Sequence, residues 1–125
     1  MVTACGERRE VFYADAARQA SAIERGWIPE WLPRSARDIR EIHDLDTNQS
    51  MLAFSFDCAD VPKLGTSCKQ IGREQLRPAP FSVAWWPNDV PPPDFVTHRH
   101  VYHHCEDGGY VAVATTGGEL FRWRP

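Results

Sequence analysis

The chain has 125 residues and a formal net charge of −3, from 14 Lys and Arg against 17 Asp and Glu. With 42% hydrophobic residues, a chain of this length can build one globular core. No basic stripe is broad enough to follow a phosphate backbone, so we expect no nucleic-acid partner. No apolar run approaches the ~20 residues of a membrane-spanning helix. The sequence therefore predicts a single domain over residues 8–125.

The first six residues read MVTACG and resemble the end of a bacterial lipoprotein signal. In such a signal a branched apolar residue and two small residues precede the acceptor cysteine. We therefore interpret residues 1–7 as a residual signal or anchor segment and expect Cys5 to carry a lipid that attaches the protein to the membrane. This places the domain in the bacterial cell envelope, facing the periplasm or the cell surface. A chance match at a chain end is the alternative.

Three further cysteines, Cys58, Cys68 and Cys105, could be oxidised in that compartment. Three is an odd number, so one thiol is left over. Cys58 and Cys68 close a short loop that contains Pro62 and Gly65, which makes this pair a candidate disulfide. Cys105 is an equally good partner for either of them, and the pairing stays open.

Residues 8–25 contain no Gly or Pro and place apolar side chains at helical spacing, at Phe12, Ala16, Ala20 and Ile23. Gly26 follows where a helix C-cap is expected. This pattern predicts an amphipathic N-terminal helix. Next, Trp27–Pro33 (WIPEWLP) holds two prolines and should run as an extended anchoring segment.

A hairpin is predicted after this segment. Ile39, Glu41, His43 and Leu45 occupy alternate positions of a strand, and Leu52, Phe54 and Phe56 do the same in a second strand, Ser50–Phe56. Between the two strands, Asp46–Gln49 supplies side chains that bond to their own backbone in tight turns. We therefore expect an antiparallel hairpin.

Asp44, Asp46 and Asn48 form D-x-D-x-N, the opening of an EF-hand calcium loop. Gln49 stands where that loop needs glycine, and Ser55 stands where it needs a bidentate glutamate. A structural turn is therefore favoured over a calcium site. No nucleophile or metal ligand nearby completes a catalytic set with the two aspartates, so we predict no catalytic residue.

The run W-I-P-x-W-L-P-x-S-A-x-x-I, followed by H-D-L-D-T-N and an aromatic strand, resembles a family of small bacterial envelope proteins, many of them lipoproteins, related to the YbbD head domain. The resemblance covers mainly residues 26–56, with a looser echo at Trp85–Pro87 and Phe121–Trp123. It implies an α+β domain at the envelope and brings no catalytic residue with it.

The second half of the chain reads mostly as strands and loops. We expect a short helix within Asp60–Ile71, a strand at Phe81–Trp86, and a three-stranded meander from about His98 to Arg124, with turns at the Gly108–Gly109 and Gly117–Gly118 pairs. The aromatic face of the last strand should bury against the N-terminal helix.

The segment Phe95–Cys105 (FVTHRHVYHHC) is the metal candidate of the chain, because His98, His100 and His104 share one face of a strand with Tyr102. Imidazoles two residues apart on a strand can share an ion. However, no Cys-x-x-Cys or His-Glu-x-x-His pattern is present, and exposed histidines are also simply solvated.

We thus predict an α+β fold, an antiparallel sheet of about five or six strands with the N-terminal helix on one face, with a small barrel as the alternative. The expected function is that of a non-enzymatic envelope lipoprotein domain without a cofactor, binding a protein or cell-wall partner. The rival interpretations are an immunity or inhibitor protein against a toxin or hydrolase, and a metal-binding protein that uses the histidine strand. The candidate interaction surface consists of Trp31, Asp44, Asp46, Trp86 and Tyr102.

Overall fold

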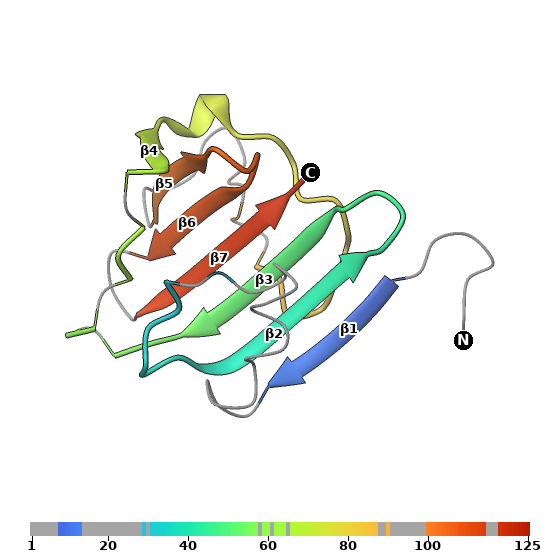
Figure 1. Ribbon diagram of the computed structural model, residues 1–125, viewed down its shortest axis with the longest axis horizontal. Helices are drawn as coiled ribbons and strands as arrows, with labels where there is room; N and C mark the ends of the chain where they lie inside the picture. Colours follow the sequence, from blue (N-terminus) through green and yellow to red (C-terminus); the bar gives the residue numbers. More distant parts are fainter. Residues whose placement is uncertain are drawn as a thin grey trace.

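Seven antiparallel strands form one sheet in the order β1-β2-β3-β7-β6-β5-β4 (Figure 1). The computed structural model describes residues 8–13 (backbone only), 29, 31–57, 59–60, 62–64, 66–87, 90, 100–114 and 118–125. The strands are β1 (Arg8–Tyr13), β2 (Arg37–Asp44), β3 (Ser50–Ser55), β4 (Cys68–Ile71), β5 (His100–Cys105), β6 (Tyr110–Ala114) and β7 (Glu119–Arg124).

The sheet consists of two meanders that meet at its centre. Strands β1, β2 and β3 follow each other on one side, and β4, β5, β6 and β7 follow each other on the other side, so that β3 and β7 pair in the middle. Strands β1 and β4 lie at opposite edges (Figure 1). The connection from β3 to β4 therefore runs from the middle of the sheet to one edge.

The predicted N-terminal helix, and with it the α+β fold class, is wrong. Residues Arg8–Tyr13 form β1, which pairs with β2 from Arg8 opposite Asp44 to Tyr13 opposite Ile39. The sequence RREVFY contains three good strand formers, and the edge of β2 supplies partners for its backbone, so tertiary pairing overrides the weak helical pattern. The rest of the expected helix, residues 14–25, lies outside the described residues. Where the structure is described, it holds no α-helix, only a short 3-10 helix at Arg73–Gln75.

The hairpin and the C-terminal meander are confirmed. Strands β2 and β3 pair from His43 opposite Ser50, and a bulge shifts their register between Arg37 and Arg40, where Asp38 has a positive φ of 52°. Strands β5, β6 and β7 pair in succession. Period-two alternation and turn residues were sufficient to locate these elements.

Two expectations for the middle of the chain are wrong. Residues 68–71 of the expected helix form the edge strand β4, which pairs with β5. The expected strand Phe81–Trp86 is a loop that packs onto the sheet, with Phe81, Trp85 and Trp86 in contact with its core. The aromatic residues of this loop pack against one face of the sheet and do not belong to a hydrogen-bonded strand.

The sheet has a separate hydrophobic cluster on each face. We call one the disulfide face, formed by Ile39, Leu52, Phe54, Val111, Leu120 and Cys105. We call the other the tryptophan face, formed by Met51, Ala53, Tyr110, Ala112, Phe121 and Trp123. Neighbouring residues in β3 and β7 contribute to opposite faces, and residues 50–54 and 120–123 are all buried, so the centre of the sheet is covered on both sides.

Trp123 is the central side chain of the tryptophan face. It is fully buried, its indole N–H donates to the carbonyl of Arg77 at 2.7 Å, and its ring stacks on Tyr110. Trp86 meets Trp123 edge to face, with ring centroids 5.7 Å apart. The aromatic face of β7, which the sequence predicted to bury against an N-terminal helix, is thus covered by the segment between β4 and β5 through hydrogen bonding and aromatic contact.

Candidate functional site

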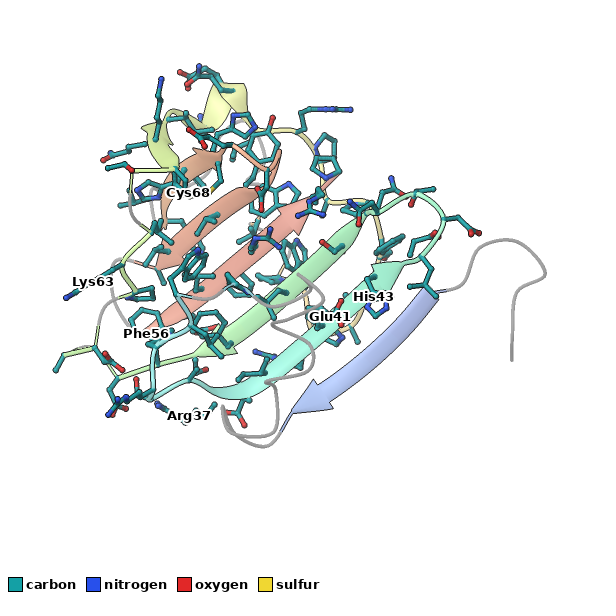
Figure 2. All side chains as sticks on the ribbon, viewed as in Figure 1. Arg37, Glu41, His43, Phe56, Lys63 and Cys68 are labelled. Carbon is teal, nitrogen blue, oxygen red and sulfur yellow. A yellow bond between two sulfur atoms is a disulfide. The ribbon has the colours of Figure 1, made fainter. Side chains whose placement is uncertain are left out.

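A pair of ionisable side chains lies buried on the disulfide face. Glu41 and His43 stand two residues apart on β2 and therefore point to the same side of the sheet (Figure 2). Their exposed fractions are 0% and 2%. The Nδ1 atom of His43 lies 2.8 Å and 3.0 Å from the two carboxylate oxygens of Glu41, so the imidazole engages both oxygens.

The strand register places Arg122 in the same row as this pair. Glu41 lies opposite Leu52 of β3, and Leu52 lies opposite Arg122 of β7. Residues opposite each other in neighbouring strands share a face, so the guanidinium of Arg122 points to the side of the sheet that carries Glu41. Arg122 is 4% exposed. The row thus joins the two meanders across the centre of the sheet.

Burial determines the protonation of this row. Removal of the Glu41 carboxyl group from water raises its pKa from 4.5 to about 8, although the positive charge of Arg122 acts in the opposite direction. At neutral pH Glu41 therefore keeps its proton in the folded protein. The uncharged carboxyl group is the less costly form of a buried acid.

Arg122 is neutralised from the other end by Asp107, in the turn between β5 and β6. Its Nη2 donates to Oδ2 of Asp107 at 2.5 Å, and Arg124 donates to the same oxygen at 3.3 Å. The backbone N–H of Gly109 donates to Oδ1 of Asp107. Partial burial of Asp107 acts to raise its pKa, but Arg122, the Gly109 N–H and Arg124 outweigh it and hold that pKa below its usual value.

Chemically, this buried row can hold and release a proton but cannot reach a substrate. The two partners in the Glu41–His43 pair are almost fully buried and engage each other, which is not the arrangement of a general acid and base at a cleft. The row is therefore a structural and electrostatic element of the sheet.

The acidic turn between β2 and β3 is organised by Asp44. Its Oδ1 accepts the backbone N–H groups of Asp46 and Thr47 at 2.9 and 3.1 Å, and its own N–H donates to the carbonyl of Gln49. Asn48 has a positive φ of 64°, a conformation that asparagine tolerates better than most residues. Because an oxygen of Asp44 already serves two amides, the geometry is that of a structural turn, as the sequence predicted.

The same turn exposes an apolar side chain. Leu45 is 46% exposed, and among the residues with described side chains it is the large hydrophobic residue at the surface. Asp46, Thr47 and Asn48 beside it are exposed as well. The turn therefore presents one leucine among polar groups on a backbone held in place by hydrogen bonds.

The aromatic part of the predicted interaction surface is only partly accessible. Tyr102 is 6% exposed and belongs to the core of the tryptophan face, so its prediction as an exposed aromatic is wrong. Trp86 is half-buried, packs on Phe121 and Trp123, and donates its indole N–H to the carbonyl of Val90. Trp31 is half-buried against the core of the disulfide face.

The histidine strand places its candidates among aromatic rings. His100 and His104 share the tryptophan face, as predicted; His100 is buried beside Tyr102 and Phe121, while His104 stacks on Tyr110 with centroids 4.5 Å apart. His98 lies outside the described residues. In the part of the chain that is described, no three His, Cys, Asp or Glu side chains gather as a metal ion requires.

A disulfide joins Cys68 to Cys105 and corrects the candidate pairing of Cys58 with Cys68. The register of β4 and β5 sets these two residues directly opposite each other, which loop length along the chain could not reveal. Cys58 and the expected lipid-bearing Cys5 lie outside the described residues. Over the described part of the chain, no helix is long and apolar enough to cross a membrane.

The sequence prediction missed the buried row. Its members are Glu41, His43 and Arg122, and Arg122 pairs with the more exposed Asp107. A signal was present in the sequence. Ile39, Glu41 and His43 occupy alternate positions of one strand and so share a face of the sheet, and Ile39 is fully buried. Arg122 stands between Phe121 and Trp123 in a strand that is covered on both faces, a position where a charge needs a partner.

The fold and the site together define a class: an antiparallel β domain with a disulfide at one edge, a buried ion row across its centre and an exposed hairpin turn. The family model of the YbbD head domain matches residues 10–55, a segment that runs from β1 to the last residue of β3 and contains the turn. The chain is similar to that domain over this segment. No curated protein sequence and no solved structure matches the chain significantly.

Proposed function

We propose that this chain is the binding domain of a non-enzymatic lipoprotein of the bacterial cell envelope, attached to the membrane through a lipid on Cys5 and engaging a protein partner with its β2–β3 turn. The observation that carries the proposal is the turn itself. Leu45 is exposed at its tip, and Asp44 holds the surrounding backbone through two hydrogen bonds. A preordered turn loses little conformational entropy on binding.

Two further observations support the location and the mode of action. Disulfides such as Cys68–Cys105 persist in oxidising compartments, which include the bacterial periplasm and cell surface. The segment similar to the YbbD head domain contains the turn. Three acidic side chains are engaged internally, with Glu41 on His43, Asp107 on Arg122, and Asp44 on its turn.

Site-specific photo-crosslinking tests the binding surface. Leu45 is replaced by p-benzoylphenylalanine in the protein expressed in its own bacterium, and the cells are irradiated. The control position is Glu74, which is exposed on the 3-10 helix that follows β4 at the other edge of the sheet. We expect one discrete protein adduct from position 45 that is absent from position 74. Adducts that are the same from both positions, or recovery of cell-wall fragments with no protein adduct from position 45, would overturn the proposed surface.

Metabolic labelling tests the anchor. Cells that express the protein from its chromosomal locus are fed an alkyne-bearing fatty acid, and the protein is purified and inspected for label. We expect label on the native protein and none on Cys5→Ala. Equal labelling of both, or of neither, contradicts the lipid on Cys5.

A further inference from the structure

The buried Glu41–His43 pair holds a position where a change of charge affects several strands at once. It lies on β2, which has a strand on either side, and its row runs through β3 to Arg122 of β7. The exposed fraction of each of the two residues is 2% or less. A charge that appears there has no solvent to screen it and acts on the packing of the disulfide face.

We propose that the Glu41–His43 pair is a pH-sensitive lock. It holds β2 against β3 and β7 while Glu41 keeps its buried proton, and it weakens this half of the sheet when that proton leaves. The inference concerns the fold alone and does not depend on what the β2–β3 turn binds. It assigns a role to the two buried ionisable side chains that the proposed binding surface does not use.

Among the described side chains, the groups around the pair offer only partial compensation for a buried carboxylate. In β7, Arg122 shares its face but is already engaged by Asp107, which Arg124 also contacts. In β3, the residues opposite are Leu52 and Ser50, neither of them charged. In β1, the Cα of Arg9 lies opposite that of His43. Proton loss therefore converts the Glu41 carboxyl group into a carboxylate that competes with Asp107 for Arg122.

The direction of the pH dependence follows from counting protons in the folded and unfolded chains. In the folded chain burial raises the pKa of Glu41 to about 8, so Glu41 keeps its proton up to that pH. In the unfolded chain the same carboxyl group loses its proton near its ordinary pKa of 4.5. Between these two values the folded state binds more protons, so stability falls as pH rises. With these two values, loss of the Glu41 proton lowers the folding equilibrium constant ~16-fold between pH 6.5 and pH 8.

Urea denaturation of the native protein, Glu41→Gln and Glu119→Gln at pH 6.5, 7.2 and 8 tests the lock. Glu119→Gln is the matched control, because it makes the same substitution at a half-buried position in β7. We expect the folding constant to fall ~16-fold more over this range in the native protein and in Glu119→Gln than in Glu41→Gln. Comparison with Glu41→Gln cancels the contributions of the other histidines.

A second measurement on the native protein keeps the inference testable if Glu41→Gln does not fold. The carboxyl carbon of Glu41 is followed by NMR in protein labelled with 13C at glutamate side chains, together with amide hydrogen exchange in β2, β3 and β7. We expect a titration midpoint near pH 8 and, over the same range, faster opening of these strands than of β5 and β6. A midpoint near 4.5, or opening that is independent of this titration, overturns the lock.

Discussion

Replacement of Asp44 by Ala should destabilise the domain more than any other single change in the β2–β3 turn. Asp44 is 6% exposed, and its Oδ1 accepts the N–H groups of Asp46 and Thr47 at 2.9 and 3.1 Å. Loss of a charged acceptor leaves both amides to the solvent, since they lie near the surface. Two such bonds contribute about 2 kcal/mol in total. For a domain of this size, that corresponds to a decrease in Tm of about 6 to 10 °C.

Thermal unfolding followed by circular dichroism at pH 6 measures this effect, with two matched variants as controls. Asp44→Asn keeps a carbonyl oxygen in place and should lose less than half as much stability. Asp46→Ala removes an exposed side chain beside the same turn and should change the free energy of unfolding by less than ~0.5 kcal/mol. Equal losses in Asp44→Ala and Asp46→Ala would refute the assignment of the turn to Asp44.

Three further changes test other parts of the fold. Asn48→Gly should leave the urea midpoint unchanged or slightly higher. Asn48→Val should lower the free energy of unfolding by ~1 kcal/mol or more, because the backbone at residue 48 has a φ of 64°. Equal effects of the two substitutions contradict the left-handed backbone. Replacement of Cys68 and Cys105 by Ser should cost up to ~4 kcal/mol in urea denaturation, from a loop of sequence separation 37; a loss below 1 kcal/mol counts against the crosslink. Trp123→Phe should cost ~2 to 4 kcal/mol and diminish the near-UV dichroism, because the bond to Arg77 and part of the packing are lost; a stable variant with native dichroism contradicts the packing.

The sequence predicted the local parts of the fold because their signals are local. The β2–β3 hairpin and the β5–β6–β7 meander follow from alternation and turn residues within a few positions. Residues 8–13 were misassigned because their spacing fits a weak helix, whereas the edge of β2, distant in sequence, determines their state. The same limit applies to β4, which is too short to be recognised without its partner β5.

The candidate site was harder to predict because its parts are joined only by tertiary structure. Glu41 and His43 share a strand face with Ile39, but charged residues in a strand usually face the solvent. Their proximity to Arg122 depends on the pairing of β3 with β7, which the sequence does not reveal. The disulfide likewise depends on the register of β4 and β5. The turn was recognised, yet its hydrogen bonds come from Asp44 rather than from the exposed Asp46.

The central claim is that this domain works in the oxidising space of the cell envelope, and the state of its cysteines there tests that claim most directly. Intact cells are treated with a membrane-permeant alkylating reagent before lysis, and the protein is digested without reduction and mapped by mass spectrometry. We predict a crosslinked peptide pair that contains Cys68 and Cys105, recovered from the envelope fraction. Alkylation of both cysteines as free thiols in protein from the cytosolic fraction would contradict the account.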